Sequence, residues 1–439
     1  MSQLKKSLSP LLLWSIGVGN VISGMYFGWN LGLEKGGTLG MAIATFIVII
    51  LYVCFSFSYA ELACAIPKAG GGFDYAHRAF GPKIGFLAGL SQIIIFLFAA
   101  PAIAIGVASN LNLAFPALSI TTYSILIYIV FTLINILGVK LAAQFELVVT
   151  ILAILGLVLF SAYTFPHFSV KNLVKNPSIG GLNGILAAIP FAIWFFLGIE
   201  GMANVAEETE NPQKDLSKGF GRAIATLVFL CVMVFISSVG LKGWESVVYN
   251  EAGTVSDSPL TIVLAVIYGK NSLIYSLLIG VSIVGIVASF HGIVLSGGRA
   301  TFEFANFGYL PGILGKIQTK FKTPANALIF NTLTGILIIL SGKTGEIITI
   351  AVFGAITLYA ISMASLVKLR KAEPNLLRPF KVPLYPFMPI LAFILSALCF
   401  LAMAIFNFTL VLIFGAILLV SYILFEFIIK NNAKPSLKE

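Results

Sequence analysis

The chain of 439 residues is 59% hydrophobic and only 10% charged, with a formal net charge of +10. A soluble domain carries roughly 25% charged residues because its surface must be solvated, so a soluble fold is excluded for most of this chain. The basic residues lie in short segments between apolar runs instead of forming one basic face, which argues against nucleic acid as a partner. We therefore expect a single membrane domain over residues 1–439, surrounded by the lipid bilayer.

About twelve apolar runs are long enough to span a bilayer, since about 20 helical residues cross a hydrocarbon core of about 30 Å. This pattern predicts an all-α polytopic membrane protein. The predicted spans are Leu11–Leu33, Thr38–Cys64, Ile84–Leu111, Ser119–Gly138, Leu141–Phe165, Asn183–Ala206, Gly219–Leu241, Ser272–Thr301, Ala325–Leu340, Glu346–Val367, Pro386–Phe406 and Thr409–Ile429.

The distribution of basic residues predicts the orientation of these spans. With a cytoplasmic N-terminus, 21 of the 27 Lys and Arg fall in cytoplasmic segments and 6 fall in outer segments. Positively charged loops tend to stay on the cytoplasmic side. We therefore expect a multi-pass protein of the cytoplasmic membrane with both termini in the cytoplasm.

Two of the predicted spans are poorly suited to a continuous helix. Residues 17–24 in the first span contain three glycines, Asn20 and Ser23, and residues 194–201 in the sixth contain two glycines and Glu200. A glycine costs a helix about 1 kcal/mol relative to alanine, and free backbone groups at membrane depth survive only where they line a protein-buried or aqueous cavity. The alternative is that the glycines only allow close helix packing. Because both segments show the feature, we predict two broken helices, centred near Ile22 and Gly198.

The spacing of the two breaks predicts an internal repeat. They lie five spans apart, an odd number, so the second copy enters the membrane from the opposite side, as an inverted repeat requires. We expect a first five-helix repeat over residues 11–165, a second over 183–367, and two peripheral helices over 386–429.

A broken helix exposes N–H groups that suit an anion and C=O groups that suit a cation. We therefore expect a substrate site where the two breaks meet, and the ring faces of its aromatic residues could attract a cation. Its candidate substrate-binding residues are Val21, Ile22, Ser23 and Gly24 in the first span and Trp194, Phe195, Gly198 and Glu200 in the sixth.

Four ionisable residues in or near the spans have predicted roles. A carboxylate at the bilayer centre costs about 2.5–3.5 kcal/mol on insertion scales, so Glu200 is expected to bind the substrate, carry a coupling proton or close the helix break by a hydrogen bond. His291 in the eighth span is a candidate proton carrier or hydroxyl partner, with simple hydrogen bonding as the alternative. Glu61 and Glu146 lie near span ends, where we expect them to reach the interface and to be structural.

No motif of an enzyme or a primary pump is present in the sequence. It lacks a phosphate-binding Gly-x-x-x-x-Gly-Lys-[Ser/Thr] loop, a His-Glu-x-x-His pair and a Gly-x-Ser-x-Gly turn. We therefore expect no catalytic residues, no cofactor and no metal site, and transport driven by an ion gradient (protons or sodium) or by exchange. The remote alternative is a membrane sensor that transports nothing.

Three segments resemble the amino acid–polyamine–organocation superfamily of transporters. Residues 17–25 are similar to its first-span glycine motif. Residues 194–200, followed by residues 207–214, are similar to its sixth span and to the cytoplasmic Glu-x-x-x-Pro-x-[Lys/Arg] signature after it. Residues 297–301 with 308–311 are similar to the inner end of its eighth span. The resemblance implies a five-plus-five inverted repeat with discontinuous first and sixth helices, which works by alternating access.

The departures from the superfamily pattern bear on the substrate. The Gly-[Ser/Thr]-Gly whose N–H groups are implied to hold an amino acid's carboxylate aligns with Ser23-Gly24-Met25, so methionine replaces a glycine. This favours an amine without a carboxylate. Residues 21–24 with 28–30, and residues 289–292, look like ethanolamine permeases within the superfamily, and the fifth-span lysine of some proton-coupled relatives has no counterpart.

The resemblance therefore favours ethanolamine, with an amino acid permease or exchanger of the same fold as the alternative. We expect ethanolammonium between the two breaks, with its charge on backbone carbonyls, Trp194 and Phe195, and with Glu200 nearby. Its hydroxyl is expected to reach Ser23 or His291.

Overall fold

The computed structural model of the chain describes residues 6, 8–137, 142–174 and 177–429. The named elements of this part are helical, and Leu8–Thr209 and Tyr249–Val255 form isolated bridges. The helices are α1 (Pro10–Tyr26), α2 (Asn30–Ala65), α3 (Gly72–Phe80), α4 (Pro82–Ala114), α5 (Ile120–Leu137), α6 (Ala142–Thr164), η1 (Phe165–His167), α7 (Val170–Leu173), α8 (Gly181–Trp194), η2 (Ile199–Glu208), α9 (Pro212–Val239), α10 (Glu245–Val248), α11 (Pro259–Tyr268), α12 (Leu273–Asn306), α13 (Ala325–Ile339), α14 (Thr344–Ala372), α15 (Phe387–Phe406), α16 (Phe408–Leu424) and η3 (Phe425–Ile429).

The described helices confirm the predicted all-α polytopic membrane fold. Ten segments are long and apolar enough to span a membrane, and the shorter apolar helices α1 and α13 account for the other two of the twelve predicted spans. The apolar helix α11 was not predicted as a span and has only 10 residues. Lys5, Lys140, Lys175, Lys430, Lys434 and Lys438, which entered the count of loop charges, lie outside the described residues.

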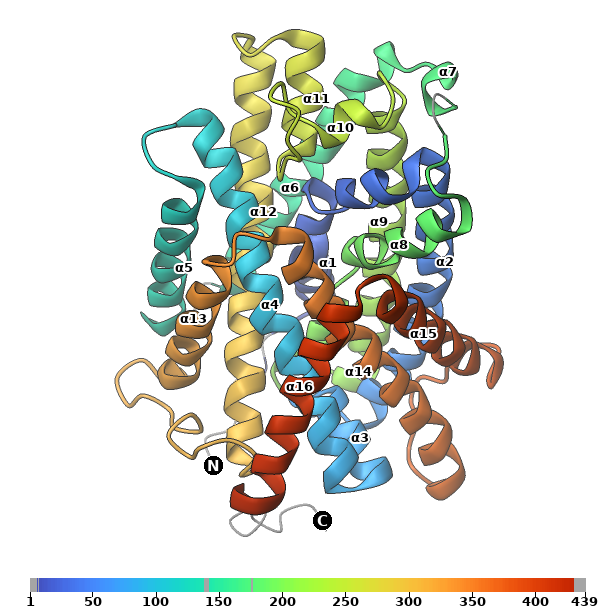
Figure 1. Cartoon of the computed structure of the whole chain (residues 1–439). Helices are drawn as coiled ribbons and strands as arrows, with labels where there is room; N and C mark the ends of the chain where they lie inside the picture. Colours follow the sequence, from blue (N-terminus) through green and yellow to red (C-terminus); the bar gives the residue numbers. More distant parts are fainter. Residues whose placement is uncertain (1–5, 7, 138–141, 175–176, 430–439) are drawn as a thin grey trace.

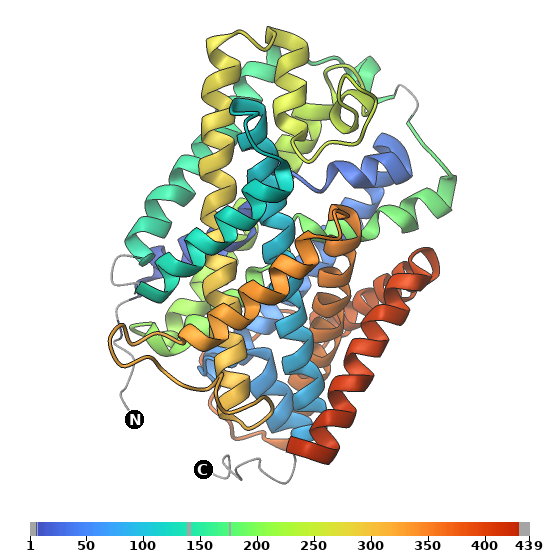
Figure 2. The same ribbon diagram turned by 60° about the vertical axis from the view of Figure 1, so that its left-hand side comes forward.

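The helices divide into a packed interior and an outer layer. The most apolar window of α4 is 89% buried, whereas that of α16 is 17% buried and leaves most of its side chains facing outward. In the interior, α1 packs against α6, α9 and α12, α2 packs against α8, and α4 packs against α12 and α14. Figures 1 and 2 show α5 and α16 on the outside of the bundle, α3 at one end, and α10 and α11 at the other. The division of residues 11–165 and 183–367 into two inverted repeats stays a prediction.

The first span is broken, but beyond the glycines at 17, 19 and 24 that predicted the break. Helix α1 runs without interruption to Tyr26, and the chain leaves the helix at Phe27, with φ −158° and ψ 171°. Gly28 has φ 87°, and residues 30–36 continue as helix to a kink at Gly37. The prediction of a break near Ile22 is therefore wrong by about one turn. The glycines of α1 allow close packing instead, because a β-carbon at Gly17 would collide with Met202.

The predicted break in the sixth span is confirmed. Helix α8 ends at Trp194, residues 195–198 form turns, and Gly198 has φ 107°, a left-handed conformation that favours glycine. The chain then continues as the 3₁₀-helix η2. The two discontinuous segments therefore provide a pair of interrupted helices inside the bundle.

The expectation that Glu61 and Glu146 reach the interface is wrong, since their exposed fractions are 0% and 4%. Glu61 accepts hydrogen bonds from Nε and Nη2 of Arg370 at 2.8 and 2.6 Å and from the N–H of Val382 at 2.7 Å. Nε of Arg378 lies 3.5 Å from the same carboxylate. Glu61 thus joins α2 to α14 and to the segment before α15, which agrees with the structural role predicted for it.

Replacing Glu61 with glutamine should destabilise the protein strongly, because two arginines then lose a buried counter-ion. Breaking such a buried pair costs about 3–5 kcal/mol. The matched control is Glu346→Gln, since Glu346 forms an exposed pair with Lys343 at 2.9 Å that should contribute at most about 1 kcal/mol. Thermal unfolding in detergent should show a midpoint several degrees lower for Glu61→Gln alone. Equal midpoints for the two variants would contradict the structural role.

Candidate functional site

The two helix breaks meet inside the bundle. A β-carbon at Gly24 would collide with the carbonyl oxygen of Trp194, so α1 lies directly on the backbone where α8 ends. The Trp194 indole donates a hydrogen bond to the Phe27 carbonyl at 3.0 Å, and the two rings contact edge to face with centroids 5.6 Å apart. Trp29 stacks on Phe195 with centroids 5.4 Å apart. Aromatic side chains thus connect the break at residues 27–29 to the break at residues 195–198.

The backbone N–H groups of residues 23–28, which lead into the first break, have partners. Residues 23–26 are helical, so their N–H groups lie in the i→i−4 ladder of α1. The N–H of Phe27 donates to the Ser23 carbonyl at 3.2 Å, and that of Gly28 donates to Oδ1 of Asn30 at 3.1 Å. Two carbonyls are also used, since Trp29 donates to the Met25 carbonyl at 3.2 Å and Trp194 to that of Phe27. No N–H group of residues 23–28 is free to hold an anion here.

Glu200 lies at the second break and is only 1% exposed. Its Oε2 accepts hydrogen bonds from the Gly198 N–H at 3.3 Å and from the Tyr359 hydroxyl at 2.7 Å. The Tyr359 hydroxyl lies 3.1 Å from that of Tyr52, which in turn donates to the Ile193 carbonyl at 3.4 Å. The other oxygen, Oε1, is buried without a hydrogen-bond partner. One carboxylate oxygen therefore closes the break, as one alternative predicted, and the other can still accept from a cation.

Two serines connect α1 to α12 beside the breaks. The Ser289 hydroxyl lies 2.6 Å from the Asn20 carbonyl, to which it donates, and 2.8 Å from the Ser23 hydroxyl. Because the Ser289 hydroxyl donates its proton to the Asn20 carbonyl, the Ser23 hydroxyl donates to Ser289. The lone pairs of the Ser23 oxygen then remain able to accept a hydrogen bond. Gly198 packs against the same carbonyl, since a β-carbon there would lie 3.2 Å from it. Ser23 is thus a hydroxyl acceptor close to the second break, whereas Val21 and Ile22 are buried in helix α1.

The structure pairs His291 with Glu146. Nδ1 of His291 lies 3.6 Å from Oε2 of Glu146, and both side chains are buried. The imidazole contacts the rings of Phe131 and Phe145, so it faces α5 and α6 instead of Ser23. Neither carboxylate oxygen of Glu146 has a conventional hydrogen-bond partner, nor has Nδ1 of His291. A carboxylic acid and an imidazole are therefore juxtaposed between α6 and α12.

Small residues bring this pair against α1. A β-carbon at Gly19 would collide with the Glu146 carboxylate, and one at Gly292 would collide with the Asn20 side chain. Oε1 of Glu146 would also lie 3.6 Å from a β-carbon at Gly292. The Asn20 carbonyl accepts from Ser289 and packs against Gly198 of the second break. The Glu146–His291 pair and the second break therefore contact the same turn of α1.

Several residues of this site could not be assigned to it from the sequence alone. Tyr359, Tyr52 and Glu146 come from α14, α2 and α6, far from the breaks in the chain. Tyrosines in apolar runs are ordinary packing residues, so no local pattern marks Tyr359 as the partner of Glu200 or Tyr52 as the partner of Tyr359. For Glu146, the useful signal was a carboxylate and a histidine both lying in apolar runs, which favours pairing inside the bundle.

Polar contacts close the bundle at both ends. At the α3 end, Nη2 of Arg299 lies 2.7 Å from Oε1 of Glu208, which ties α12 to η2. At the opposite end, Asn30 donates to the Ser256 carbonyl at 2.8 Å, and Thr344 donates to Asp257 at 3.0 Å. Burial raises the pKa of Asp257 to about 6, although the bond from Thr344 lowers it. The helices that carry the breaks are therefore fastened at each end by a few polar contacts.

The chain resembles curated transporters over most of its length. It is 28% identical to an uncharacterized transporter of Rhizobium meliloti, with 90% of this chain and 86% of the relative covered. It is 26% identical to a branched-chain amino acid permease of Bacillus subtilis, with 89% and 86% covered. A serine/threonine exchanger of Bacillus subtilis is 28% identical, with 89% of each chain covered.

These relatives are transporters by name. The family match covers residues 13–437, which includes the breaks, Glu200 and the Glu146–His291 pair. The chain is a multi-pass membrane protein that belongs to the amino acid permease family.

Proposed function

We propose that this permease is a secondary active transporter of a small amine-bearing solute and that its cargo is ethanolamine. The observation that carries the proposal is the Glu200 carboxylate in the sixth-span break. Its Oε2 binds the Gly198 N–H, and its Oε1 is buried without a partner. A buried unpaired acceptor of this kind is satisfied by an ammonium group, which donates charge-assisted hydrogen bonds.

The same geometry disfavours a carboxylate on the cargo. The start of η2 already has an anion in Glu200, and the N–H groups of residues 23–28 have partners. A second carboxylate would meet no free N–H group among residues 23–28 and would be repelled by Glu200. The bulk of Met25, which is fully buried, supports the same conclusion.

The cargo's hydroxyl fits the serine pair of α1 and α12. In the proposed complex, the ammonium binds Oε1 of Glu200, with the rings of Trp194 and Phe195 lining the site. The hydroxyl donates to Ser23, whose own proton is directed at Ser289 2.8 Å away. We assign no contact with the cargo to His291, because it pairs with Glu146.

An amino acid cargo is the second candidate, and the printed names of the relatives favour it. One is called a branched-chain amino acid permease and another a serine/threonine exchanger. An amino acid has the same ammonium, so Oε1 of Glu200 could bind that group equally well. The two candidates differ only in whether a carboxylate is tolerated.

We further propose alternating access in the cytoplasmic membrane, with both termini in the cytoplasm. The 21:6 distribution of basic residues supports this orientation. Under this proposal, the Arg299–Glu208 pair opens on the cytoplasmic side. The Asn30–Ser256 and Thr344–Asp257 contacts open on the outer side. The contacts at each end are few, so the free energy lost when one end opens is small enough to be offset by the contacts that keep the other end closed.

We propose protons as the coupling ion and the Glu146–His291 pair as their binding site. The pair is buried and spans α6 and α12, and Gly19 lets it contact α1. Around it lie Asn20, Thr150 and two phenylalanines, and neither member forms another ion pair within the described residues. Adding or removing one proton changes the charge where three helices meet, which can bias their packing.

Cargo choice should be tested with pairs of compounds that differ only in the carboxylate. Uptake of labelled ethanolamine into proteoliposomes should be inhibited by unlabelled ethanolamine at least tenfold better than by serine. The same order should hold for isoamylamine over leucine, because Glu200 repels the carboxylate of each amino acid. If only the carboxylate-bearing members compete, the cargo is an amino acid and the ethanolamine proposal is wrong.

Glu200→Gln should raise the KM for the amine by about 10- to 100-fold, since a hydrogen bond to a charged group contributes about 1.5–3 kcal/mol. Glutamine can still accept from Gly198 and Tyr359, so the break should stay closed and thermal stability should change little. Glu210→Gln, in the exposed loop after η2, is the matched control and should leave KM unchanged. Equal, mild effects of the two changes would remove Glu200 from the site.

His291→Gln and Glu146→Gln should each abolish stimulation of uptake by an inward proton gradient while exchange of cargo without a gradient persists. The reason is that the glutamines cannot take up the coupling proton. His167→Gln removes an exposed imidazole from η1 and should keep the stimulation. Uptake should be measured with and without the gradient and with and without sodium. Stimulation that survives in both variants, or that requires only sodium, would refute the proton site.

A further inference from the structure

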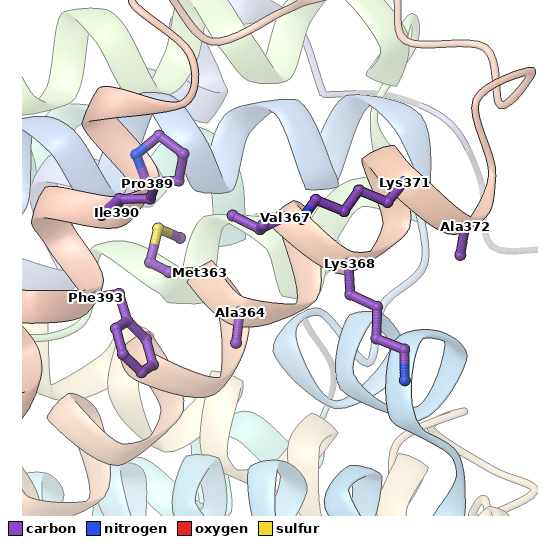
Figure 3. Close-up of a pocket in the computed structure, with 9 residues that line it drawn as sticks. All are labelled: Met363, Ala364, Val367, Lys368, Lys371, Ala372, Pro389, Ile390 and Phe393. Atoms are coloured by element: carbon purple, nitrogen blue, oxygen red, sulfur yellow. The ribbon is translucent and has the colours of Figure 1, made fainter.

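An open groove lies between α14 and α15, away from the helix breaks. Its volume is about 640 Å³, and Figure 3 shows the nine residues that line it. Seven of them have apolar side chains, including Met363, Val367 and Phe393, and two are Lys368 and Lys371. Ile390 and Phe393 are 43% and 42% exposed, so the apolar wall faces outward. An apolar groove on the outer surface of a membrane-spanning bundle opens towards the lipid acyl chains.

The charged residues around the groove divide into two groups. Arg370 and Arg378 bind Glu61. Glu373 is the acidic residue nearest in sequence to the two lysines, and its carboxylate is bound by Arg78 at 2.6 Å. Lys368 and Lys371 are exposed, and neither forms an ion pair with any residue that the structure describes. The arginines of this segment therefore hold the fold together, while two lysines remain uncompensated at the groove.

The two lysines border the groove from the last turns of α14. Figure 3 shows the Lys371 side chain lying back along the helix towards Val367. Lys368 points towards α3, where its Nζ lies 4.4 Å from the centroid of the Phe80 ring. Positive charge at the end of a spanning helix, next to an apolar wall that continues along it, matches a phospholipid with an anionic headgroup.

We propose that this groove binds an anionic phospholipid. The headgroup phosphate pairs with Lys371 and Lys368, and the acyl chains pack along Val367, Met363, Ile390 and Phe393. A zwitterionic lipid could fill the apolar wall but would carry no net negative charge to the lysines. A soluble anion could pair with the lysines but would leave the wall unfilled. Only an anionic lipid satisfies both parts of the groove.

The proposal can be tested by native mass spectrometry of the whole purified protein with added phosphatidylglycerol or phosphatidylcholine of matched acyl chains. The protein should retain phosphatidylglycerol preferentially. Lys368→Gln/Lys371→Gln should weaken its binding by about 10- to 30-fold, the loss expected for two lysines at a membrane surface, and should leave phosphatidylcholine unaffected. Ala364→Phe, which fills the groove and leaves the lysines in place, should weaken the binding of both lipids.

The matched control is Lys316→Gln/Lys320→Gln, which removes two lysines from the segment between α12 and α13 and should not change lipid binding. Inorganic phosphate should fail to displace the lipid. The proposal is overturned if the two double variants lose phosphatidylglycerol equally, if the wild type holds both lipids equally well, or if phosphate alone displaces the lipid. It is also overturned if the groove variants instead lose a dimer, because a second copy of the chain would then be the occupant.

Discussion

The structure depends on one constraint of the bilayer: a helix broken in hydrocarbon leaves backbone groups that water cannot satisfy. Here side chains at the breaks bind some of these groups. The Trp194 indole from one break binds the Phe27 carbonyl of the other, and Glu200 caps the Gly198 N–H across the left-handed turn. Close contact between α1 and the end of α8 requires glycine at position 24, since any side chain there would meet the Trp194 backbone.

Using a carboxylate as the cap has a consequence for recognition. The start of a helix normally attracts anions, but at η2 the protein supplies its own in Glu200. The cap needs only one of its two oxygens, and the second is held in a buried position without a donor. Under the proposed function, one side chain both closes the backbone and attracts a cation, which would make the break selective for amines.

The site and the proposed coupling pair share a single turn of α1. Asn20 accepts from Ser289 through its carbonyl and contacts Gly292 through its side chain, while neighbouring Gly19 makes room for Glu146. A rotation of α1 would therefore disturb both places together. If the proposed sites are correct, this contact gives a physical route by which a proton on the Glu146–His291 pair can affect a cargo at residues 198–200 without touching it.

The sequence by itself determined the membrane fold, the ten long apolar helices of the described residues and the break at Gly198, because hydropathy and a glycine beside a carboxylate are local properties. The first break was predicted in the wrong place, because glycines at positions 17, 19 and 24 are compatible both with a helix break and with close helix packing. Only the tertiary structure decided between these roles, by bringing Met202, Glu146 and Trp194 against them. It also decided the partners of Glu200 and Glu146, because Tyr359 and His291 lie more than a hundred residues away and only helix packing brings them into contact.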